Sequence, residues 1–253
     1  MKVYESAKIL ACNHDHGVHT MSLQAPKIAK SAKPGQFVMV YLDKGEHLLP
    51  RPISLFNVDK PSGIITLAYA VAGAGTEIIA TWPLGHTVRV LGPLGNGFDL
   101  DNIRAGDKVA LVGGGIGTPP LFYLALELHK RGVQMDVYLG FRHDSPMLIN
   151  CFETLTDNLV VATEDGSRGH KGYVTDCLTP SYTTILSCGP IPMLKALAKY
   201  ASSHNIPCQV SVEERMGCGL GACKGCVVKT LVGYQLCCLD GPVFDSREVK
   251  WDE

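Results

Sequence analysis

Short apolar runs separated by turn residues characterise the first 100 residues of the chain. Three of them occupy Phe37–Leu42, Ile53–Val58 and Ile64–Val71. The first follows Lys33-Pro34-Gly35 and the third follows Pro61-Ser62-Gly63. Because proline and glycine interrupt regular elements, runs of this length and spacing predict short strands, and their even distribution is typical of a small antiparallel barrel.

From about residue 101 onward, the pattern changes to alternating strands and helices. A short apolar strand at Lys108–Val112 leads into a glycine-rich turn, and apolar residues then recur at helical spacing over Pro119–Arg131. Such alternation predicts a parallel, doubly wound sheet. The other expected elements are strands at Met135–Phe141, Leu159–Thr163, Thr184–Ser187 and Cys208–Val212, and helices at Pro146–Leu155 and Pro192–Ser203.

The segment from Glu213 onward is rich in glycine and cysteine and is too short to form an apolar core of its own. A segment of this kind usually needs a metal to fold. The fold class predicted for the whole chain is therefore a β-barrel plus an α/β sheet. The expected divisions are a barrel over residues 1–100, a doubly wound sheet over 101–212, and a small metal-binding segment over 213–253.

Composition and charge exclude several classes of protein. Hydrophobic residues make up 46% of the 253 residues, which argues against disorder. The 23 basic and 24 acidic residues nearly cancel, whereas a nucleic-acid-binding protein needs a basic surface. No apolar run reaches the length of a membrane span, and the N-terminus does not resemble a secretory signal. We therefore expect a cytoplasmic protein without a membrane or nucleic-acid partner.

Half of the ten cysteines lie within 21 residues near the C-terminus. Because export is not indicated, reduced thiols or metal ligands are expected rather than disulfides. Cys218, Cys223 and Cys226 follow the C-x4-C-x2-C spacing of plant-type [2Fe–2S] proteins. A fourth thiolate is required, and spacing alone leaves Cys237 and Cys238 as alternatives. A structural zinc site is less consistent with the four-residue gap, because zinc knuckles favour C-x2-C pairs or histidine.

A candidate phosphate site lies at Arg51-Pro52-Ile53-Ser54, which is expected to close a barrel strand. A fixed guanidinium beside a hydroxyl suits a phosphate, although a surface arginine in an ordinary strand is the simpler interpretation of these four residues alone. Gly73–Thr76 precedes a short helix expected at Thr76–Trp82, where glycines and free N–H groups would admit a pyrophosphate. Tyr69, just upstream, is expected either to pack against a flavin or to be a half-buried strand aromatic.

A candidate nucleotide site lies in the α/β region. Gly113, Gly114, Gly115 and Gly117 form a turn between a strand and a helix, which is where a dinucleotide loop is expected. Cys188-Gly189-Pro190 ends a later strand at the same sheet edge, so the Cys188 thiol could lie beside a nicotinamide or could simply be a small buried side chain. Glu164 or Asp165 could bind an adenosine ribose and favour NAD, although Arg168, His170 and Lys171 are nearby.

These patterns, taken in order along the chain, resemble the ferredoxin–NADP reductase superfamily. The segments Glu213–Val227 and Cys238–Phe244, together with Gly92–Phe98, are similar to the electron transfer subunits of type B, NAD-dependent dihydroorotate dehydrogenases. This resemblance spans essentially the whole chain. It implies that Cys238 is the fourth cluster ligand. The residues that it implies in FAD contact are Arg51, Pro52, Ile53, Ser54, Ala68, Tyr69, Ala70, Gly75 and Thr76, with Ala70 standing where relatives often have arginine.

The resemblance also implies a partner and an electron path. The partner is an FMN-containing catalytic subunit of dihydroorotate dehydrogenase, in a heterotetramer with two subunits of each kind. Electrons from dihydroorotate would pass from FMN through [2Fe–2S] to FAD, and FAD would reduce NAD⁺ by hydride transfer, in pyrimidine biosynthesis. The barrel would bind FAD, the sheet NAD, and the C-terminal segment the cluster.

Three alternatives remain open from the sequence. One is the reductase subunit of another flavin and iron–sulfur complex, such as a bifurcating ferredoxin–NADP reductase or a sulfide dehydrogenase. Another is a non-enzymatic module stabilised by zinc, which would be colourless. The third is an NADH oxidase or diaphorase without a partner, for which a flavin alone would suffice.

Overall fold

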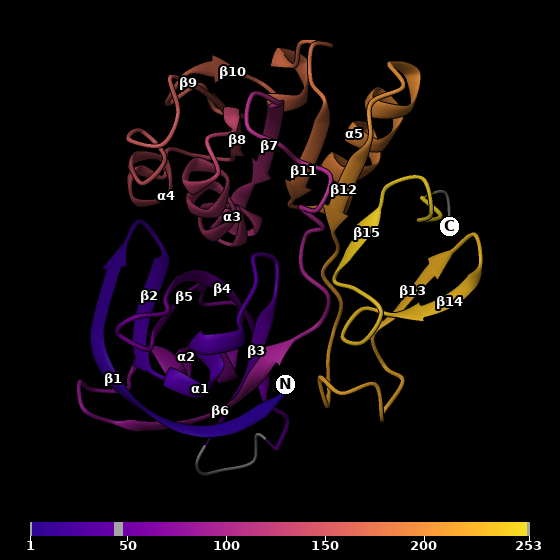
Figure 1. Ribbon diagram of the computed structural model, residues 1–253. Coiled ribbons are helices and arrows are strands. Elements are labelled where there is room, and N and C mark those ends of the chain that lie inside the picture. Colours follow the sequence, from indigo (N-terminus) through magenta and orange to yellow (C-terminus); the bar gives the residue numbers. More distant parts are fainter. Residues whose placement is uncertain (1, 43–47, 252–253) are drawn as a thin grey trace.

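The structure is a computed structural model that describes residues 2–42 and 48–251. Figure 1 shows three parts: a barrel at the bottom, an open sheet with its helices at the top, and a C-terminal segment beside both. The cysteine-rich segment is therefore placed next to both larger units.

The barrel is closed by six strands, in the order β1-β2-β5-β4-β3-β6, among the residues that the structure describes. Each pairing between neighbours is antiparallel, as the even spacing of apolar runs predicted. Its interior is filled by alternate aliphatic residues of the strands, including Leu23, Val38, Leu55 and Leu67. The barrel elements are β1 (Val3–Asp15), β2 (Val18–Gln24), α1 (Pro26–Ser31), β3 (Phe37–Tyr41), β4 (Arg51–Asp59), β5 (Ile64–Ala70), α2 (Ala74–Ala80) and β6 (Thr87–Leu94).

Two expectations for the barrel are corrected. Arg51 opens β4 rather than closing a strand, so Arg51-Pro52-Ile53-Ser54 forms the first half of that strand. Helix α2 begins at Ala74 rather than Thr76, because the Gly73 carbonyl already accepts the N–H groups of Thr76 and Glu77. The helix ends before Pro83, as expected.

The second unit is a sheet of seven strands within the described part of the chain, in the order β10-β9-β8-β7-β11-β12-β15. The first six are parallel, whereas β15 (Val243–Asp245) is antiparallel to β12. The elements are β7 (Lys108–Gly114), the 3-10 turn η1 (Gly115–Gly117), α3 (Pro119–Lys130), β8 (Gln134–Phe141), α4 (Pro146–Asn150), β9 (Asn158–Thr163), β10 (His170–Lys171), the 3-10 turn η2 (Val174–Cys177), β11 (Thr184–Cys188), α5 (Ile191–Ser203) and β12 (Cys208–Ser211).

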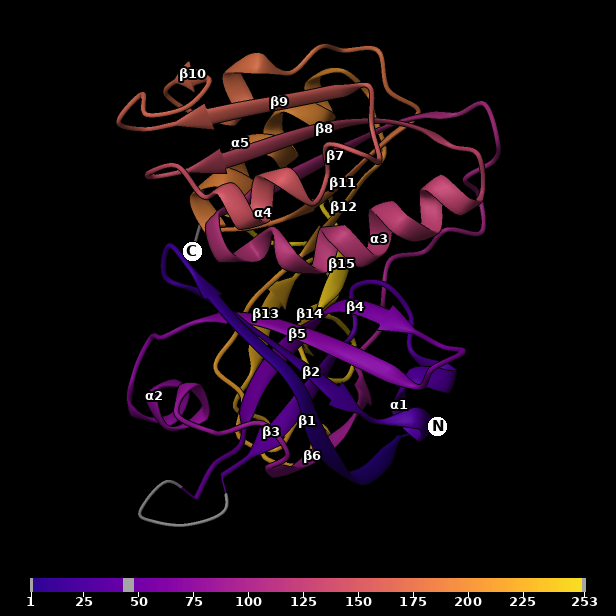
Figure 2. The ribbon, with the colours of Figure 1, turned by 90° about the vertical axis from the view of Figure 1, so that its left-hand side faces the viewer.

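Helices cover both faces of this sheet, as the doubly wound pattern predicted. Val109 and Leu111 of β7 pack with α3 and α4, whereas Ala110 and Val112 pack in the cluster that contains α5. Helix α3 lies between the sheet and the barrel (Figure 2) and contacts β4, where Phe56 stacks on Phe122 with ring centroids 4.8 Å apart. Helix α4 is shorter than expected, because residues after Asn150 continue as tight turns around the buried Phe152.

The C-terminal segment belongs to both units. It forms a hairpin of β13 (Val227–Thr230) and β14 (Gly233–Leu236), followed by β15 (Val243–Asp245), which pairs with β12. Its buried Cys226, Cys237 and Cys238 share one apolar cluster with Met39 of the barrel and Val210 of the sheet. The core that this segment could not form alone is therefore completed by its neighbours.

Candidate functional site

Four cysteines of the C-terminal segment converge from three places in the chain. Cys218 and Cys223 lie in the loop after β12, Cys226 immediately precedes β13, and Cys238 follows β14. The thiols lie in two pairs, because Cys223 N donates to Cys218 Sγ and Cys238 N donates to Cys226 Sγ. Among residues 2–42 and 48–251, no three His, Cys, Asp or Glu side chains are grouped so that they could hold one metal ion. Two pairs fit a [2Fe–2S] cluster, in which four thiolates hold two irons.

Backbone N–H groups point at these sulfur atoms. Leu220 N and Cys223 N lie 3.3 and 3.4 Å from Cys218 Sγ, and Gly221 N lies 3.2 Å from Cys238 Sγ. Gly219 and Gly221 have φ values of +70° and +82°, a backbone conformation that side chains rarely allow. The glycines therefore turn the loop so that its N–H groups face the sulfurs, where they favour thiolates and a reduced cluster.

The pKa of the Cys218 thiol reflects this loop. Burial raises it, but hydrogen bonds from the N–H groups of Cys223, Leu220 and Ala222 and from the Cys223 side chain together lower the pKa to about 6. Ligation requires the thiolate, and this position is prepared for it. The chemistry of the donor set therefore fits an iron–sulfur group.

Cys237 is directed elsewhere. Its Sγ donates to the carbonyl of Val212 at 3.1 Å, whereas Cys238 N lies 3.4 Å from Cys226 Sγ. Both side chains are buried. Of the two adjacent cysteines that spacing could not distinguish, only Cys238 lies with the other three thiols.

The expected flavin-contacting residues gather on two paired strands and one helix. Arg51, Pro52, Ile53 and Ser54 lie on β4, and Ala68, Tyr69 and Ala70 lie on the neighbouring β5. Gly75 lies against Arg51, since a Cβ built on Gly75 would be only 2.0 Å from Arg51 Nε. Thr76 Oγ1 accepts from Ala72 N and donates to the Gly73 carbonyl, which holds the turn before α2 in place. A guanidinium beside this glycine turn fits a phosphate-bearing cofactor.

The ring of Tyr69 belongs largely to the barrel. It is 7% exposed, packs within the barrel cluster, and stacks on His19 with centroids 5.5 Å apart. Burial raises the pKa of its hydroxyl to about 12. The alternation of β5 places Ala68 and Ala70 on the opposite face from Tyr69, which leaves small side chains on that face.

The two expected parts of the nucleotide site meet. Strand β11 pairs with β7 so that Cys188 is opposite Gly113. A Cβ on Gly117 would lie 2.6 Å from the Cα of Gly189, and one on Gly114 would lie 2.7 Å from Pro190 Cδ. Only glycines allow the η1 turn and the Cys188-Gly189-Pro190 turn to approach this closely. Both lie at the carboxyl edge of the sheet, where open α/β sheets bind ligands.

Thr118 is a residue of this site that the sequence did not indicate. It caps the start of α3, is fully buried, and its Oγ1 has no hydrogen-bond partner. An unpaired buried hydroxyl is costly, so it marks a place where a ligand would satisfy it. Its position after the glycine turn is the only sequence signal that could have found it.

The Cys188 thiol is buried and protonated. Burial raises its pKa far above the usual range, and the Glu213 carboxylate raises it further. The thiol is therefore a neutral buried group rather than a nucleophile.

Among the described residues, the helices are too short and too polar to span a bilayer.

Comparisons with known proteins agree with this arrangement. Residues 213–250 match the family model described as the iron-sulfur cluster binding domain of dihydroorotate dehydrogenase B. The chain is 41% identical over 240 residues to the "dihydroorotate dehydrogenase B (NAD(+)), electron transfer subunit" of Shouchella clausii, covering 91% of this chain and 92% of the relative. The similarly named protein of Clostridium acetobutylicum is 39% identical, covering 98% and 95%.

Solved structures share the fold. The structure of an NADH-dependent reduced ferredoxin-NADP oxidoreductase superposes with a TM-score of 0.86 at 30% identity, covering 97% of this chain and 90% of that one. A ferredoxin NADP⁺ reductase from Neisseria gonorrhoeae with bound FAD and NADP has a TM-score of 0.63 at 18% identity, covering 79% and 91%. The second likeness concerns the fold alone.

The converging thiols, the barrel beside a doubly wound sheet, and about 40% identity over nearly full-length relatives lead to one conclusion. The chain belongs to the family of electron transfer subunits of NAD-dependent dihydroorotate dehydrogenase B, and is an oxidoreductase subunit.

Proposed function

We propose that this subunit binds a [2Fe–2S] cluster, FAD and NAD(H), and conducts electrons between a partner flavoprotein and the nicotinamide nucleotide. The observation that carries the proposal is the convergence of four thiols in two pairs, with backbone N–H groups directed at the sulfurs of Cys218, Cys226 and Cys238. The proposed cluster ligands are Cys218, Cys223, Cys226 and Cys238.

The three parts of the chain have separate tasks in this proposal. Residues 1–100 bind FAD, residues 101–212 bind NAD(H), and residues 213–253 bind the cluster. When bound, FAD supplies hydride chemistry and the cluster supplies one-electron transfer. The FAD-binding residues are Arg51, Pro52, Ile53, Ser54, Ala68, Tyr69, Ala70, Gly75 and Thr76. The NAD-binding residues are Gly113, Gly114, Gly115, Gly117, Cys188, Gly189 and Pro190.

The chain's own residues position and shield the two nucleotides. Arg51 neutralises pyrophosphate charge beside Gly75, and the small Ser54 and Ala68 side chains leave room for a flat ring. The glycine turn before α3 lets its backbone approach the other nucleotide, and the buried Thr118 hydroxyl would donate to it. Since α3 also packs on β4, the two binding surfaces lie on adjoining elements at the contact between barrel and sheet.

The proposed partner is an FMN-containing dihydroorotate dehydrogenase catalytic subunit, with two copies of each subunit in a cytoplasmic complex of pyrimidine biosynthesis. The names of the relatives support a catalytic partner. Exposed leucines beside the cluster loop, Leu220 at 42% and Leu239 at 43%, support docking near the thiols.

The test is NADH production from dihydroorotate and NAD⁺ by this chain co-expressed with a candidate FMN subunit, with each chain alone as control. Activity of the pair alone is the expected result. The Cys223→Ser variant should lose this coupled activity and keep NADH-to-dye activity, since the dye accepts electrons from FAD directly. Coupled activity that survives in this variant would take the cluster off the path.

A second candidate function is that of the reductase subunit in a bifurcating ferredoxin–NADP oxidoreductase, which the superposition at 30% identity favours. Relatives named for dihydroorotate dehydrogenase are more similar, at 39% and 41% identity. An inactive pair, together with activity when a larger ferredoxin-dependent flavoprotein is supplied instead, would favour this second candidate.

A further inference from the structure

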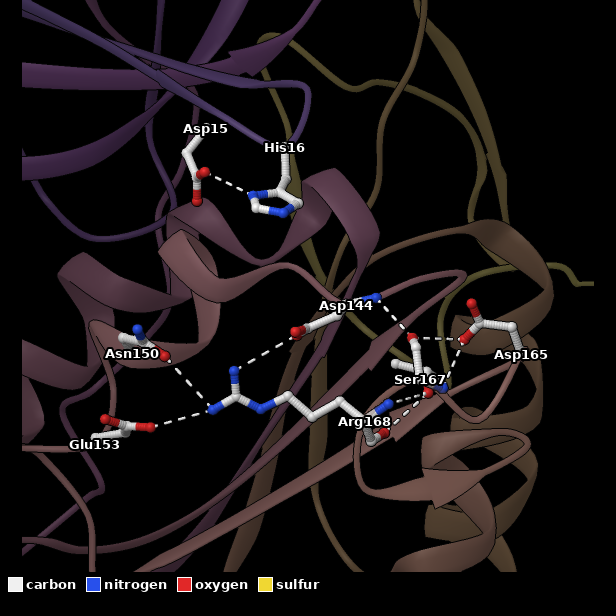
Figure 3. Close-up of polar contacts among 9 residues, drawn as sticks. Asp15, His16, Asp144, Asn150, Glu153, Asp165, Ser167 and Arg168 are labelled. Carbon is white, nitrogen blue, oxygen red and sulfur yellow. Dashed lines mark hydrogen bonds and ion pairs between the residues drawn. The ribbon is translucent and has the colours of Figure 1, made fainter.

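Polar side chains after β8 and β9 form one network at the carboxyl edge of the sheet (Figure 3). Asp165 Oδ1 accepts from Ser167 N at 2.9 Å and from Ser167 Oγ at 2.7 Å, and Asp165 Oδ2 lies 2.8 Å from His143 Nδ1. Asp144 N donates to Ser167 Oγ at 2.9 Å. The loop after β8 and the loop after β9 are thus held together as one unit.

This network lies along the same edge as the glycine turn. Gly114 of β7 is opposite Gly140 of β8, and Phe141 of β8 is opposite Thr163 of β9. Two strand spacings correspond to about 10 Å. The adenosine half of a dinucleotide whose pyrophosphate lies at the start of α3 can span that distance, so its ribose can reach the end of β9.

Of the cations in this loop, Arg168 is directed away from the edge. Its guanidinium lies 3.5 Å from Asp144 Oδ1, 3.3 Å from Glu153 Oε1 and 3.5 Å from Asn150 Oδ1. Figure 3 shows it turned toward Asn150 and Glu153, with Asp165 at the opposite end of the network. Arg168 therefore neutralises Asp144 and would have to leave two carboxylates to meet a phosphate.

Asp165 keeps its charge and one acceptor position. The hydrogen bond from His143, followed by those from Ser167, holds the pKa of Asp165 well below its usual range. A carboxylate offers roughly four lone-pair sites. Ser167 occupies two of them and His143 one, so a site on Oδ2 is left for a hydroxyl donor.

We propose that Asp165 makes this subunit select NAD(H) over NADP(H), by accepting a hydrogen bond from the adenosine 2′-hydroxyl and repelling a 2′-phosphate. The inference rests on the proposed function, because it presumes that NAD(H) binds at this edge. A fixed negative charge beside the added phosphate makes the two nucleotides unequal, and the engaged Arg168 does not offset it. Lys171, whose side chain packs on Gly166, is the cation left in the same turn.

The test compares the co-expressed complex with its Asp165→Asn variant, which keeps the side-chain size and removes the charge. The ratio of kcat/KM for NADH to that for NADPH is measured with a dye acceptor, and Kd values for NAD⁺ and NADP⁺ are measured by calorimetry. We expect the preference for NAD to fall by about tenfold or more in both measurements, because a like-charge repulsion is removed. Asp157→Asn, an exposed acid just before the other end of β9, is the matched control and should leave both ratios unchanged.

Arg168→Gln is the second variant, for the case that Asp165→Asn disturbs the loop. Its ratio of kcat/KM for NADH to that for NADPH should equal that of the unmodified complex, because the Arg168 guanidinium faces α4. A further loss of activity with NADPH would mean that Arg168 binds the 2′-phosphate, and this would overturn the role given to Asp165. Unchanged ratios in Asp165→Asn, with tight NAD⁺ binding, would overturn the role of Asp165 and leave the proposed function standing. Failure of the unmodified complex to bind either nucleotide would overturn both.

Discussion

Adjacent cysteines have different tasks at the end of β14. Cys237 donates its S–H to Val212, while Cys238 lies among the sulfurs of Cys226 and the cluster loop. We expect Cys238→Ser to lose most of the iron and the visible absorbance of the cluster. Cys237→Ser should keep both, because a hydroxyl can make the same bond to the Val212 carbonyl. Equal iron loss in the two variants, measured by colorimetric iron assay, would contradict this distinction.

A second prediction at the scale of single residues concerns the contact between Gly75 and Arg51. Gly75→Ala places a methyl carbon about where the Arg51 guanidinium lies, so the arginine must move away and its charge is lost to the phosphate. We expect FAD affinity, measured by fluorescence quenching on reconstitution, to fall by roughly tenfold or more. Gly73→Ala is the control, since a Cβ there meets nothing within 4 Å. Similar affinity loss in both would point to the turn rather than to Arg51.

Helices and strands with a local sequence pattern could be predicted, and those that depend on distant contacts could not. Strands such as β3, β7 and β8 were predicted because their apolar runs are bounded by turn residues, and α3 because its apolar spacing is regular. Strand β1 was missed because its second half extends past the barrel with most side chains exposed. Strand β15 has three residues and pairs with β12, which lies more than thirty residues earlier. No local sequence pattern therefore predicts this strand.

The residues of the candidate site also divide into those that a local sequence pattern reveals and those that only the folded structure reveals. The cluster cysteines and the glycine turns each lie within a short segment of characteristic spacing, so the sequence alone was enough to select these residues. The direction of the Cys237 thiol, the unpaired Thr118 hydroxyl and the engagement of Arg168 with Asp144 depend on tertiary contacts. Side-chain direction is set by packing around each residue, which spacing along the chain does not encode.

Strands β7 and β8 also share a buried polar network at their amino ends, and it yields a prediction for the sheet. Tyr182 donates to Asp136 Oδ2 at 2.7 Å, and Lys108 Nζ lies 2.9 Å from the same oxygen. Tyr182→Phe removes a hydrogen bond to a buried charge, which should lower the free energy of unfolding by about 2 kcal/mol. Urea unfolding measures it, and Tyr173→Phe, at an exposed position, should have no effect.

This stabilisation should depend on pH. Burial opposes ionisation of Asp136, but the hydrogen bonds from Tyr182, Lys108 and Asn158 and the Lys108 charge together outweigh it, so the pKa is lower in the folded protein than in the unfolded chain. A lowered pKa stabilises the fold above the unfolded value of about 3.9, and the contribution is lost as the pH falls below it. The difference between the unmodified protein and Tyr182→Phe should therefore shrink below about pH 4. A constant difference from pH 7 to pH 3 would exclude Asp136 as its source.

At the scale of the whole molecule, the cluster segment connects the two larger units. Its cysteines pack with Met39 of the barrel and Val210 of the sheet, and Asn96 at the end of the barrel donates its side-chain amide to Asp240. Chelation of iron should therefore lower the melting temperature of the whole chain rather than release one independent part. Differential scanning calorimetry checks this. An unchanged main transition after iron removal would show that the barrel and the sheet hold without the segment.

Strand β15 covers the outer edge of β12, and it belongs to the segment that needs iron. In a newly made chain that has not acquired its iron, β15 would not be in place. The backbone groups along the outer edge of β12 would then be unpaired and could pair with the same edge of another copy. Iron supply during synthesis would then decide between soluble protein and inclusion bodies. Expression in iron-depleted medium should yield aggregates rather than a colourless soluble protein.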